Sequence, residues 1–203
     1  MDCAECNNKK CYQGQDCTDI TEDVLKIYEE HPLYREMAEV SAELEGKYYM
    51  QLTRLEELIA FCQEMEYKRL GVAFCVGLSA EMEMLHEILA KHFEVSSVCC
   101  KVCGIEKERF DLTRIKEDRV EAMCNPIGQA TVFNMEETDL NIIFGLCIGH
   151  DILFTQHSRA PVTTLVVKDR VLAHNPIGAV YSGYYRRNKF DSEKSTRSYH
   201  PKV

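Results

Sequence analysis

The chain has 203 residues, of which 45% are apolar, so it is long enough to bury one good core and to carry a small appendage. The formal net charge is −9, and no dense run of Lys and Arg precedes the tail. This argues against a nucleic-acid partner, whose affinity would come largely from neutralised phosphates. No stretch approaches the roughly 20 apolar residues that cross a bilayer, and the polar N-terminus is unlike a secretory signal. We therefore expect no membrane partner and a cytoplasmic location.

The first part of the chain is rich in cysteine. Within residues 1–18 the spacing is C-x2-C-x4-C-x5-C, formed by Cys3, Cys6, Cys11 and Cys17. Tyr12 is the one large apolar side chain between these cysteines, so the segment needs a cross-link to fold. A Cys-x-x-Cys turn directs two thiolates at one ion, and a reducing cytosol disfavours disulfides. We predict a four-cysteine metal site, with zinc and an iron–sulfur cluster both open.

Residues 19–66 are predicted to be helical and to pack on a core. Apolar residues recur every three or four positions from Met37 to Cys62, which is the pattern of a long amphipathic helix. Cys62 lies on this apolar stripe, where a free cysteine is expected to serve in packing.

Residues 67–186 alternate between short apolar runs and helical segments. The runs 70–77, 95–103, 139–145 and 161–168 predict strands, and 79–93, 125–137, 150–158 and 175–185 predict helices, two of which begin with Asn-Pro. Strands buried on both faces and separated by helices indicate an α/β fold with a mostly parallel, doubly wound, Rossmann-like sheet of four to five strands. Residues 187–203 are predicted to be a disordered tail.

Several of the other cysteines follow predicted strands or precede predicted helices. Ligands of such sheets bind at the carboxyl ends of the strands, and helix N-termini stabilise thiolates there. Cys103, Cys124 and Cys147 are the favoured ligands of a second iron–sulfur or zinc site, while Cys75, Cys99 and Cys100 are expected to fill space. Five other residues are candidates for a fourth ligand, ligand orientation or substrate binding: His150, Asp151, Lys168, Asp169 and His174.

The segment "GLCIGHD" around Cys147 has a second interpretation. It fits G-x-C-x-G, a turn that exposes a nucleophile between a strand and a helix. "FGLCIGHD" is also similar to the nucleophile turn of class I glutamine amidotransferases, which implies a cysteine that attacks an amide with help from a downstream histidine. His174 or His150 would then be the catalytic partner of Cys147, with Asp169 completing a triad.

A wider resemblance covers most of the chain. The segments "CAECNNKKCYQGQDC", "CGIEK", "CNPIGQA", "TDLNIIFGLCIGHDILF" and "APVTTLVVKDRVLAHNP" together resemble an uncharacterised family of predicted metal-binding proteins. That family occurs in anaerobic bacteria and archaea and is described as a domain of unknown function. The resemblance implies metal binding and no defined reaction.

The sequence thus predicts a metal-binding protein, with redox or sulfur-handling chemistry open. A cysteine-nucleophile hydrolase or amidotransferase and a non-catalytic, metal-stabilised interaction protein are the alternatives. Whether the protein is an enzyme, which small-molecule or redox partner it has, and whether it forms a homo-oligomer are not decided by the sequence.

Overall fold

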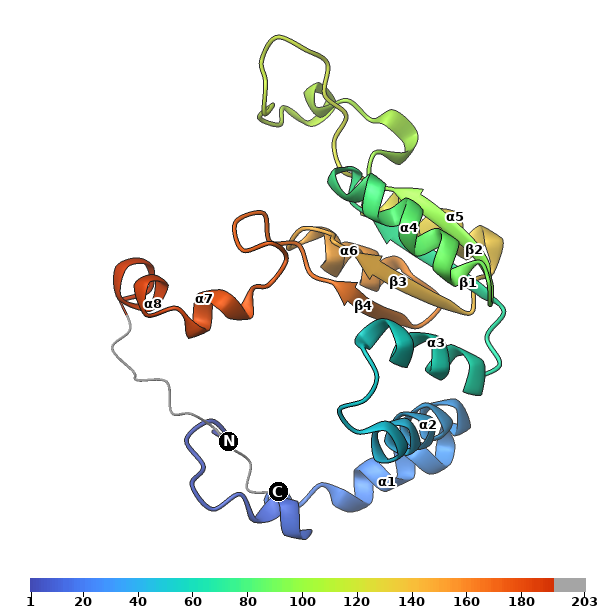
Figure 1. Cartoon of the computed structure of the whole chain (residues 1–203), viewed down its shortest axis with the longest axis vertical. Helices are drawn as coiled ribbons and strands as arrows, with labels where there is room; N and C mark the ends of the chain where they lie inside the picture. The colour runs from blue at the N-terminus through green and yellow to red at the C-terminus, as the bar shows by residue number, and fades with distance from the viewer. Residues whose placement is uncertain (192–203) are drawn as a thin grey trace. The chain divides into compact units, whose positions relative to one another are not determined.

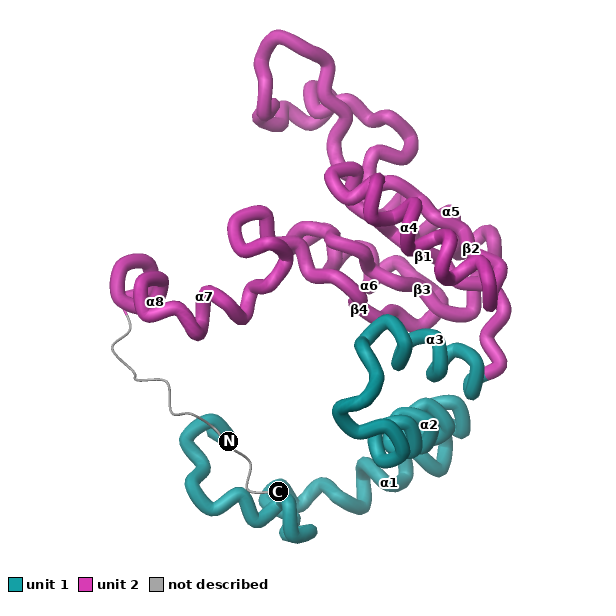
Figure 2. The backbone as a smooth tube through the Cα atoms, in the orientation of Figure 1, with its two compact units in different colours: residues 1–65 teal, residues 66–203 magenta. Residues whose placement is uncertain are grey.

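A computed structural model describes residues 1–191. The chain divides into two compact units, residues 1–65 and 66–203, which Figure 2 distinguishes by colour. The boundary falls where the predicted helical segment gives way to the predicted sheet.

The first unit is helical beyond its N-terminal segment. A 3-10 turn, η1 (Lys10–Gln13), is followed by α1 (Thr21–Glu30), α2 (Pro32–Tyr48) and α3 (Arg54–Glu64). Leu44, Leu58 and Cys62 are buried in this unit, so the packing role expected for Cys62 is confirmed.

The expected long helix is in fact two helices, α2 and α3. Thr53 accepts a hydrogen bond from the backbone N–H of Glu56, and the Glu56 carboxylate accepts one from the backbone N–H of Thr53. This reciprocal capping box starts a new helix, and Met50 just before it adopts a positive φ of 57°. The apolar stripe continues through the break, which explains why its periodicity alone predicted one helix.

The second unit contains the predicted sheet (Figure 1). Its strands are β1 (Arg69–Phe74), β2 (Glu94–Cys99), β3 (Leu140–Phe144) and β4 (Val162–Val166), all parallel and in the order β2-β1-β3-β4. Helix α4 (Ser79–Leu89) covers one face, and α5 (Pro126–Glu136) with α6 (His150–His157) covers the other. The predicted α/β class and parallel topology are confirmed.

The core between the sheet and the α5–α6 pair contains cysteine. Ala73, Ile143, Ala130, Phe133 and Phe154 are at most 2% exposed, and Phe133 meets Phe154 edge to face. Cys75 and Cys100 belong to the same buried cluster, and Cys99 and Cys124 pack against it. The carboxyl ends of β1 and β2 are therefore fixed by the core itself.

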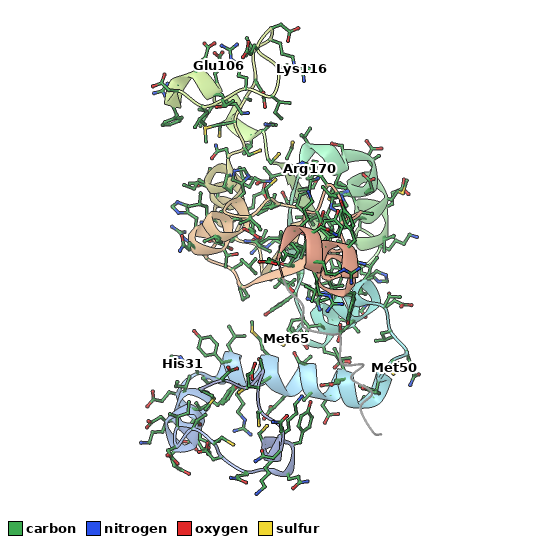
Figure 3. The ribbon with its side chains drawn as sticks, turned by 90° about the vertical axis from the view of Figure 1, so that its left-hand side faces the viewer. His31, Met50, Met65, Glu106, Lys116 and Arg170 are labelled. Carbon is green, nitrogen blue, oxygen red and sulfur yellow. The ribbon has the colours of Figure 1, made fainter. Side chains whose placement is uncertain are left out.

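The chain makes a long excursion between β2 and α5. Residues 101–124, which we call the excursion loop, contain the 3-10 turns η3 (Val102–Gly104) and η4 (Lys107–Phe110). A single antiparallel bridge pairs Glu106 with Ala122, and Lys107 forms a 2.9 Å ion pair with Glu121. Glu106 and Lys116 mark this loop in Figure 3.

The two Asn-Pro sequences start their helices differently. Asn125 caps α5 by accepting a hydrogen bond from the N–H of Gly128 at 2.9 Å, as predicted. Asn175 does not cap: helix α7 (Ile177–Tyr181) begins after Pro176, whose side chain makes no cap bond. Ser182 instead caps a further helix, α8 (Gly183–Lys189), so one predicted helix is divided in two.

The predicted tail overlaps the end of α8. Residues 187–189 are helical, and the remainder of the predicted tail from residue 192 lies outside the described residues. None of the helices within residues 1–191 is long and apolar enough to span a bilayer.

Candidate thiol centre at the strand ends

Three cysteines meet at the carboxyl ends of β1 and β2, and we call Cys75, Cys100 and Cys124 the strand-edge thiols. The sulfur of Cys100 lies 3.8 Å from that of Cys124, and the Cys100 thiol is also hydrogen bonded to Cys75. Cys100 therefore occupies the middle of the group. It is 2% exposed, Cys75 is 7% exposed and Cys124 is half-buried.

Backbone hydrogen bonds fix the positions of these thiols. The N–H of Cys100 donates to the carbonyl of Phe74, immediately before Cys75, at 2.8 Å. The N–H of Asn125, immediately after Cys124, donates to the carbonyl of Cys100 at 2.7 Å. The parallel pairing of β1 and β2 and the return of the excursion loop thus bring three distant segments together.

Gln129 adds a side-chain clamp at the same place. Its Nε2 donates to the carbonyls of Val98 at 2.6 Å and Phe74 at 3.2 Å, so helix α5 holds the ends of both strands. Gln129 is fully buried. No sequence pattern pointed to Gln129, because its role depends on which strands are neighbours.

Each outer thiol of the group lies beside a cation. Lys168 contacts Cys75, and both side chains flank Gly77, where an added Cβ would meet Lys168 Nζ at 3.6 Å and Cys75 Sγ at 3.9 Å. Lys101 lies beside Cys124, and its Nζ is held by the carbonyl of Ala122 at 2.6 Å. The two distances at Gly77 are ordinary van der Waals contacts, so the Lys168 and Cys75 side chains approach its backbone closely without requiring a glycine there.

The thiols differ in how readily they lose a proton. Hydrogen bonding from Cys100 lowers the pKa of Cys124 to about 5, with further help from Lys101 and His150. Hydrogen bonding from Cys100, opposed by burial, likewise lowers the pKa of Cys75 to about 5, and Lys168 contributes. The pKa of Cys100 is raised, because its proton is shared with Cys124 and Cys75 and its sulfur is buried. Cys75 and Cys124 are therefore the members of the group that lose a proton more readily, and Cys100 is the one that keeps it.

Cys147 lies on the same edge, after β3. Arg170, which is labelled in Figure 3, donates from Nη2 to the Cys147 sulfur at 3.1 Å. This contact raises the pKa of the Arg170 guanidinium, and the nearby Cys75 and Cys124 raise it further. The carbonyl of Cys147 accepts the backbone N–H groups of His150 and Asp151 at the start of α6. Gly145 has a φ of +74°, and an added Cβ there would lie 2.2 Å from Leu78, so this turn requires glycine.

His174 is held by the loop that follows β4. Its Nδ1 accepts the N–H of Asp169 at 3.1 Å, and Asp169 Oδ1 accepts the N–H groups of Val171 and Leu172. Because Nδ1 is an acceptor, the neutral ring carries its proton on Nε2. His174 in this conformation offers an N–H donor from Nε2, whereas a metal ligand or a general base needs a lone pair there.

The other candidates are placed elsewhere. Cys103 is exposed on the excursion loop with a φ of 70°, beside a cavity of about 790 Å³ that Ile105 and Phe110 also line. Asp151 lines a cavity of about 310 Å³ together with Ile143 and Thr164. The sequence favoured Cys103 as a ligand over Cys75 and Cys100, whereas the structure groups Cys124 with the latter two.

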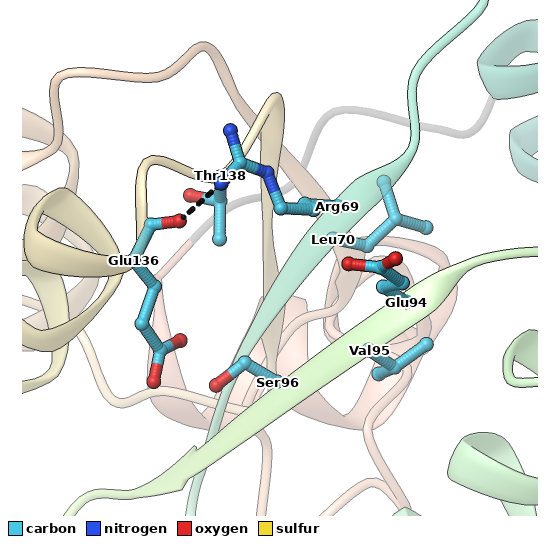
Figure 4. Close-up of a pocket in the computed structure, with 7 residues that line it drawn as sticks. All are labelled: Arg69, Leu70, Glu94, Val95, Ser96, Glu136 and Thr138. Carbon is cyan, nitrogen blue, oxygen red and sulfur yellow. Dashed lines mark hydrogen bonds between the residues drawn. The ribbon is translucent and has the colours of Figure 1, made fainter.

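The opposite end of the sheet has a cavity of a different kind. It measures about 290 Å³ and is lined by charged and small side chains of β1, β2 and the end of α5, including Arg69, Glu94 and Glu136 (Figure 4). Arg69 donates to the carbonyl of Glu136 at 3.1 Å. Since its lining contains no cysteine or histidine, this cavity is a weaker candidate than the thiol edge.

The N-terminal cysteines are arranged loosely. Cys3, Cys6, Cys11 and Cys17 are all exposed, and a turn closes with the N–H of Cys6 donating to the carbonyl of Cys3 at 3.4 Å. Asp16 organises the end of the segment by accepting from the hydroxyls of Thr18 and Thr21, each at 2.7 Å. All eleven cysteines are free thiols, and within residues 1–191 no three Cys, His, Asp or Glu side chains stand ready in a metal-coordinating geometry.

The fold and this edge define an α/β protein with a parallel sheet whose strand ends carry a group of thiols. Residues 12–165 match a family described as "Protein of unknown function (DUF1847)". The chain is also 55% identical over 194 residues to "Uncharacterized protein MJ0455" of Methanocaldococcus jannaschii, covering 95% of this chain and all of that relative. The chain therefore belongs to the DUF1847 family, as the expected resemblance to an uncharacterised family with archaeal members implied. No solved structure matches it.

Proposed function

We propose that this protein binds metal through cysteine, with one centre at the strand-edge thiols. The proposal is carried by the 3.8 Å separation of the Cys100 and Cys124 sulfurs, with Cys75 in contact with the same Cys100 thiol. Two thiolates bound tetrahedrally to one ion at about 2.3 Å are themselves about 3.8 Å apart. The thiolate-favouring surroundings of Cys75 and Cys124 add support, because the thiolate is the ligating form.

The spacing favours a single ion over a four-iron cluster. In a four-iron cluster each cysteine binds a different iron, so its thiolates stand farther apart than two ligands of one ion. A single soft-ligand site suits zinc, or one iron, and such an ion supplies Lewis acidity if a coordination position is open and structural cross-linking if it is closed. The thiol donor set fits either role.

Cys147 is the candidate for a fourth ligand. It lies on the same edge, and Arg170, which donates to its sulfur, carries a charge that also acts on Cys75 and Cys124. His174 is a weaker candidate, since ligation through Nε2 requires that it first release the bond from Asp169 to Nδ1.

The N-terminal cysteines are proposed as a second, separate site. The Cys3–Cys6 turn has the spacing with which two thiolates reach one ion, and Cys11 and Cys17 follow within the same exposed segment. A metal would here act as the cross-link of a segment that buries no side chain of its own.

Metal analysis of protein purified without oxygen tests both sites. We expect one metal equivalent to be lost in Cys124→Ser and a different one in Cys6→Ser, while the matched control Cys99→Ser, beside Cys100 in the chain, keeps both. Visible absorbance and sulfide analysis distinguish a single ion from a cluster. Protein free of both zinc and iron after purification in the presence of these metals would contradict the proposal.

A nucleophilic Cys147 is the second candidate function. The observation in its favour is the guanidinium of Arg170, which donates to the Cys147 sulfur at 3.1 Å in the turn between β3 and α6. Iodoacetamide treatment of metal-loaded protein separates the two functions: a ligated Cys147 is protected, whereas a nucleophile is alkylated rapidly. Rapid labelling without loss of metal would favour the nucleophile.

A further inference from the structure

Cys100 and Cys124 are arranged so that a disulfide can form between them. Their sulfurs are 3.8 Å apart, and a disulfide brings two sulfurs to about 2 Å. The two backbones are already joined by the 2.7 Å hydrogen bond from the N–H of Asn125 to the carbonyl of Cys100. To form the bond, the two sulfurs must approach each other by about 1.8 Å.

The two thiols differ in solvent exposure, and this difference determines which of them reacts first. Cys124 is half-buried, whereas Cys100 is 2% exposed and lies behind it in the core cluster. A small disulfide arriving from solvent therefore meets the sulfur of Cys124 first. Cys100 is placed to attack only after Cys124 has reacted.

The surroundings of Cys124 select the charge of such a partner. Lys101 lies beside Cys124 and is fixed by its bond to the carbonyl of Ala122, and Arg170 lies on the same edge. Cations around a reacting sulfur attract anionic molecules. The fitting substrate class is a low-molecular-weight disulfide that carries carboxylates.

We propose that Cys124 and Cys100 form a dithiol pair that exchanges with small anionic disulfides, with Cys124 as the attacking thiol and Cys100 as the resolving thiol. This activity goes beyond metal binding. It uses two of the same thiols, so it belongs to the metal-free form of the site.

The exchange balances in two steps. The Cys124 thiolate attacks one sulfur of the substrate, the substrate S–S bond breaks, and one substrate thiolate leaves. Cys100 then loses its proton to solvent and attacks Cys124 Sγ, which breaks the mixed disulfide and releases the second thiolate. The substrate gains two electrons and becomes two thiols, and Cys100 and Cys124 become a disulfide.

The test uses the full chain, reduced, stripped of metal and exposed to glutathione disulfide without oxygen. After quenching by alkylation, trypsin yields the peptide 92–101, with Cys99 and Cys100, and the peptide 120–159, with Cys124 and Cys147. We expect these two peptides to be cross-linked, with fragment ions placing the bond between Cys100 and Cys124.

Variants separate the roles of the two thiols. Cys100→Ala is expected to accumulate one glutathionyl group on Cys124, because the resolving thiol is gone, and Cys124→Ser is expected to form no bond to Cys100. Cys99→Ala is the matched control and should cross-link as the wild type does. The wild-type cross-link and Cys124→Ser keep the test decisive if Cys100→Ala does not fold.

Two results would overturn the proposal: a wild-type disulfide that joins Cys100 to Cys75, or a folded Cys100→Ala variant without glutathione on Cys124. Metal content is measured on a separate sample. A protein that binds no metal but forms the Cys100–Cys124 disulfide would contradict only the metal-binding proposal. A protein that binds metal but does not form this disulfide would contradict only the disulfide-exchange proposal.

Discussion

The N-terminal cysteines and the strand-edge thiols use the same side chain in opposite ways. In residues 1–36 no side chain is buried, and the four N-terminal thiols face solvent. Cys75 and Cys100 are instead part of a packed core, and hydrogen bonds between neighbouring segments fix them. In the first region a metal would have to organise the chain, whereas in the second the chain has already organised the thiols.

The causes of thiolate stability differ in the same way. The pKa of Cys6 is lowered by local hydrogen bonds from the backbone of Lys9 and Asn8. The pKa of Cys124 is lowered chiefly by Cys100, which is 24 residues away in sequence. Local chain geometry therefore acts on the first thiol, and tertiary structure acts on the second.

The largest expected difference between the regions is their response to chelation. Removing metal should expose residues 1–18 to rapid tryptic cleavage after Lys9 and Lys10, because the segment has no core of its own. The sheet unit should stay resistant, because its buried cluster does not depend on a metal. Limited proteolysis followed by mass spectrometry measures both rates. Equal resistance of the two regions after chelation would remove the distinction between them.

Glycine substitutions should affect the stability of the two regions differently. Gly145→Ala forces a Cβ into Leu78 at a positive φ, so we expect the free energy of unfolding of the sheet unit to fall by about 2–5 kcal/mol. Gly149→Ala, with a positive φ but open space, should cost only about 1–2 kcal/mol. Gly14→Ala, in the N-terminal segment, should leave the sheet unit within about 0.5 kcal/mol of wild type.

Denaturant unfolding followed by circular dichroism gives these three values. If Gly145→Ala lowered the free energy of unfolding no more than Gly149→Ala, this would contradict the close approach of Leu78 to the turn before Cys147.

The smallest expected effect is in the pH dependence of alkylation. In metal-free protein the alkylation rate of Cys124 should be flat above about pH 6 and fall as the pH drops through about 5, where its thiolate is protonated. A cysteine in an unfolded chain loses reactivity already below about pH 8.5. The gain in rate at pH 7 should be modest, because nucleophilicity falls together with pKa.

The lowered pKa of Cys124 also makes the stability of the folded protein depend on pH. A lowered pKa of Cys124 in the folded protein contributes stability that is complete above about pH 8.5 and is lost as the pH falls toward about 5. Cys62 is the internal control, since burial raises its pKa to about 12 and it should resist alkylation throughout. Mass spectrometry of timed reactions gives both profiles, and a Cys124 midpoint near pH 8.5 would contradict the proposed sharing of the Cys100 proton.

The elements with local causes could be predicted from the sequence. Alternation of apolar runs and helical periods predicted the four parallel strands, and Asn125-Pro126 predicted the start of α5. The Thr53–Glu56 capping box was also present in the sequence, but the continuous apolar stripe obscured it. The ligand pattern of residues 1–18 depends on spacing alone, and it stays a prediction.

Which thiols meet depends on the tertiary structure. The sequence placed Cys99, Cys100 and Cys103 together at the end of one strand and favoured Cys103 as the ligand, whereas the structure brings Cys100 to Cys75 and Cys124. The choice of Cys100 follows from its backbone bond to Phe74, which exists because β1 and β2 are neighbours, and from the return of the excursion loop at Asn125. Strand order and loop return are set by the packing of the whole core, so cysteines that look equivalent in sequence take different places in the fold.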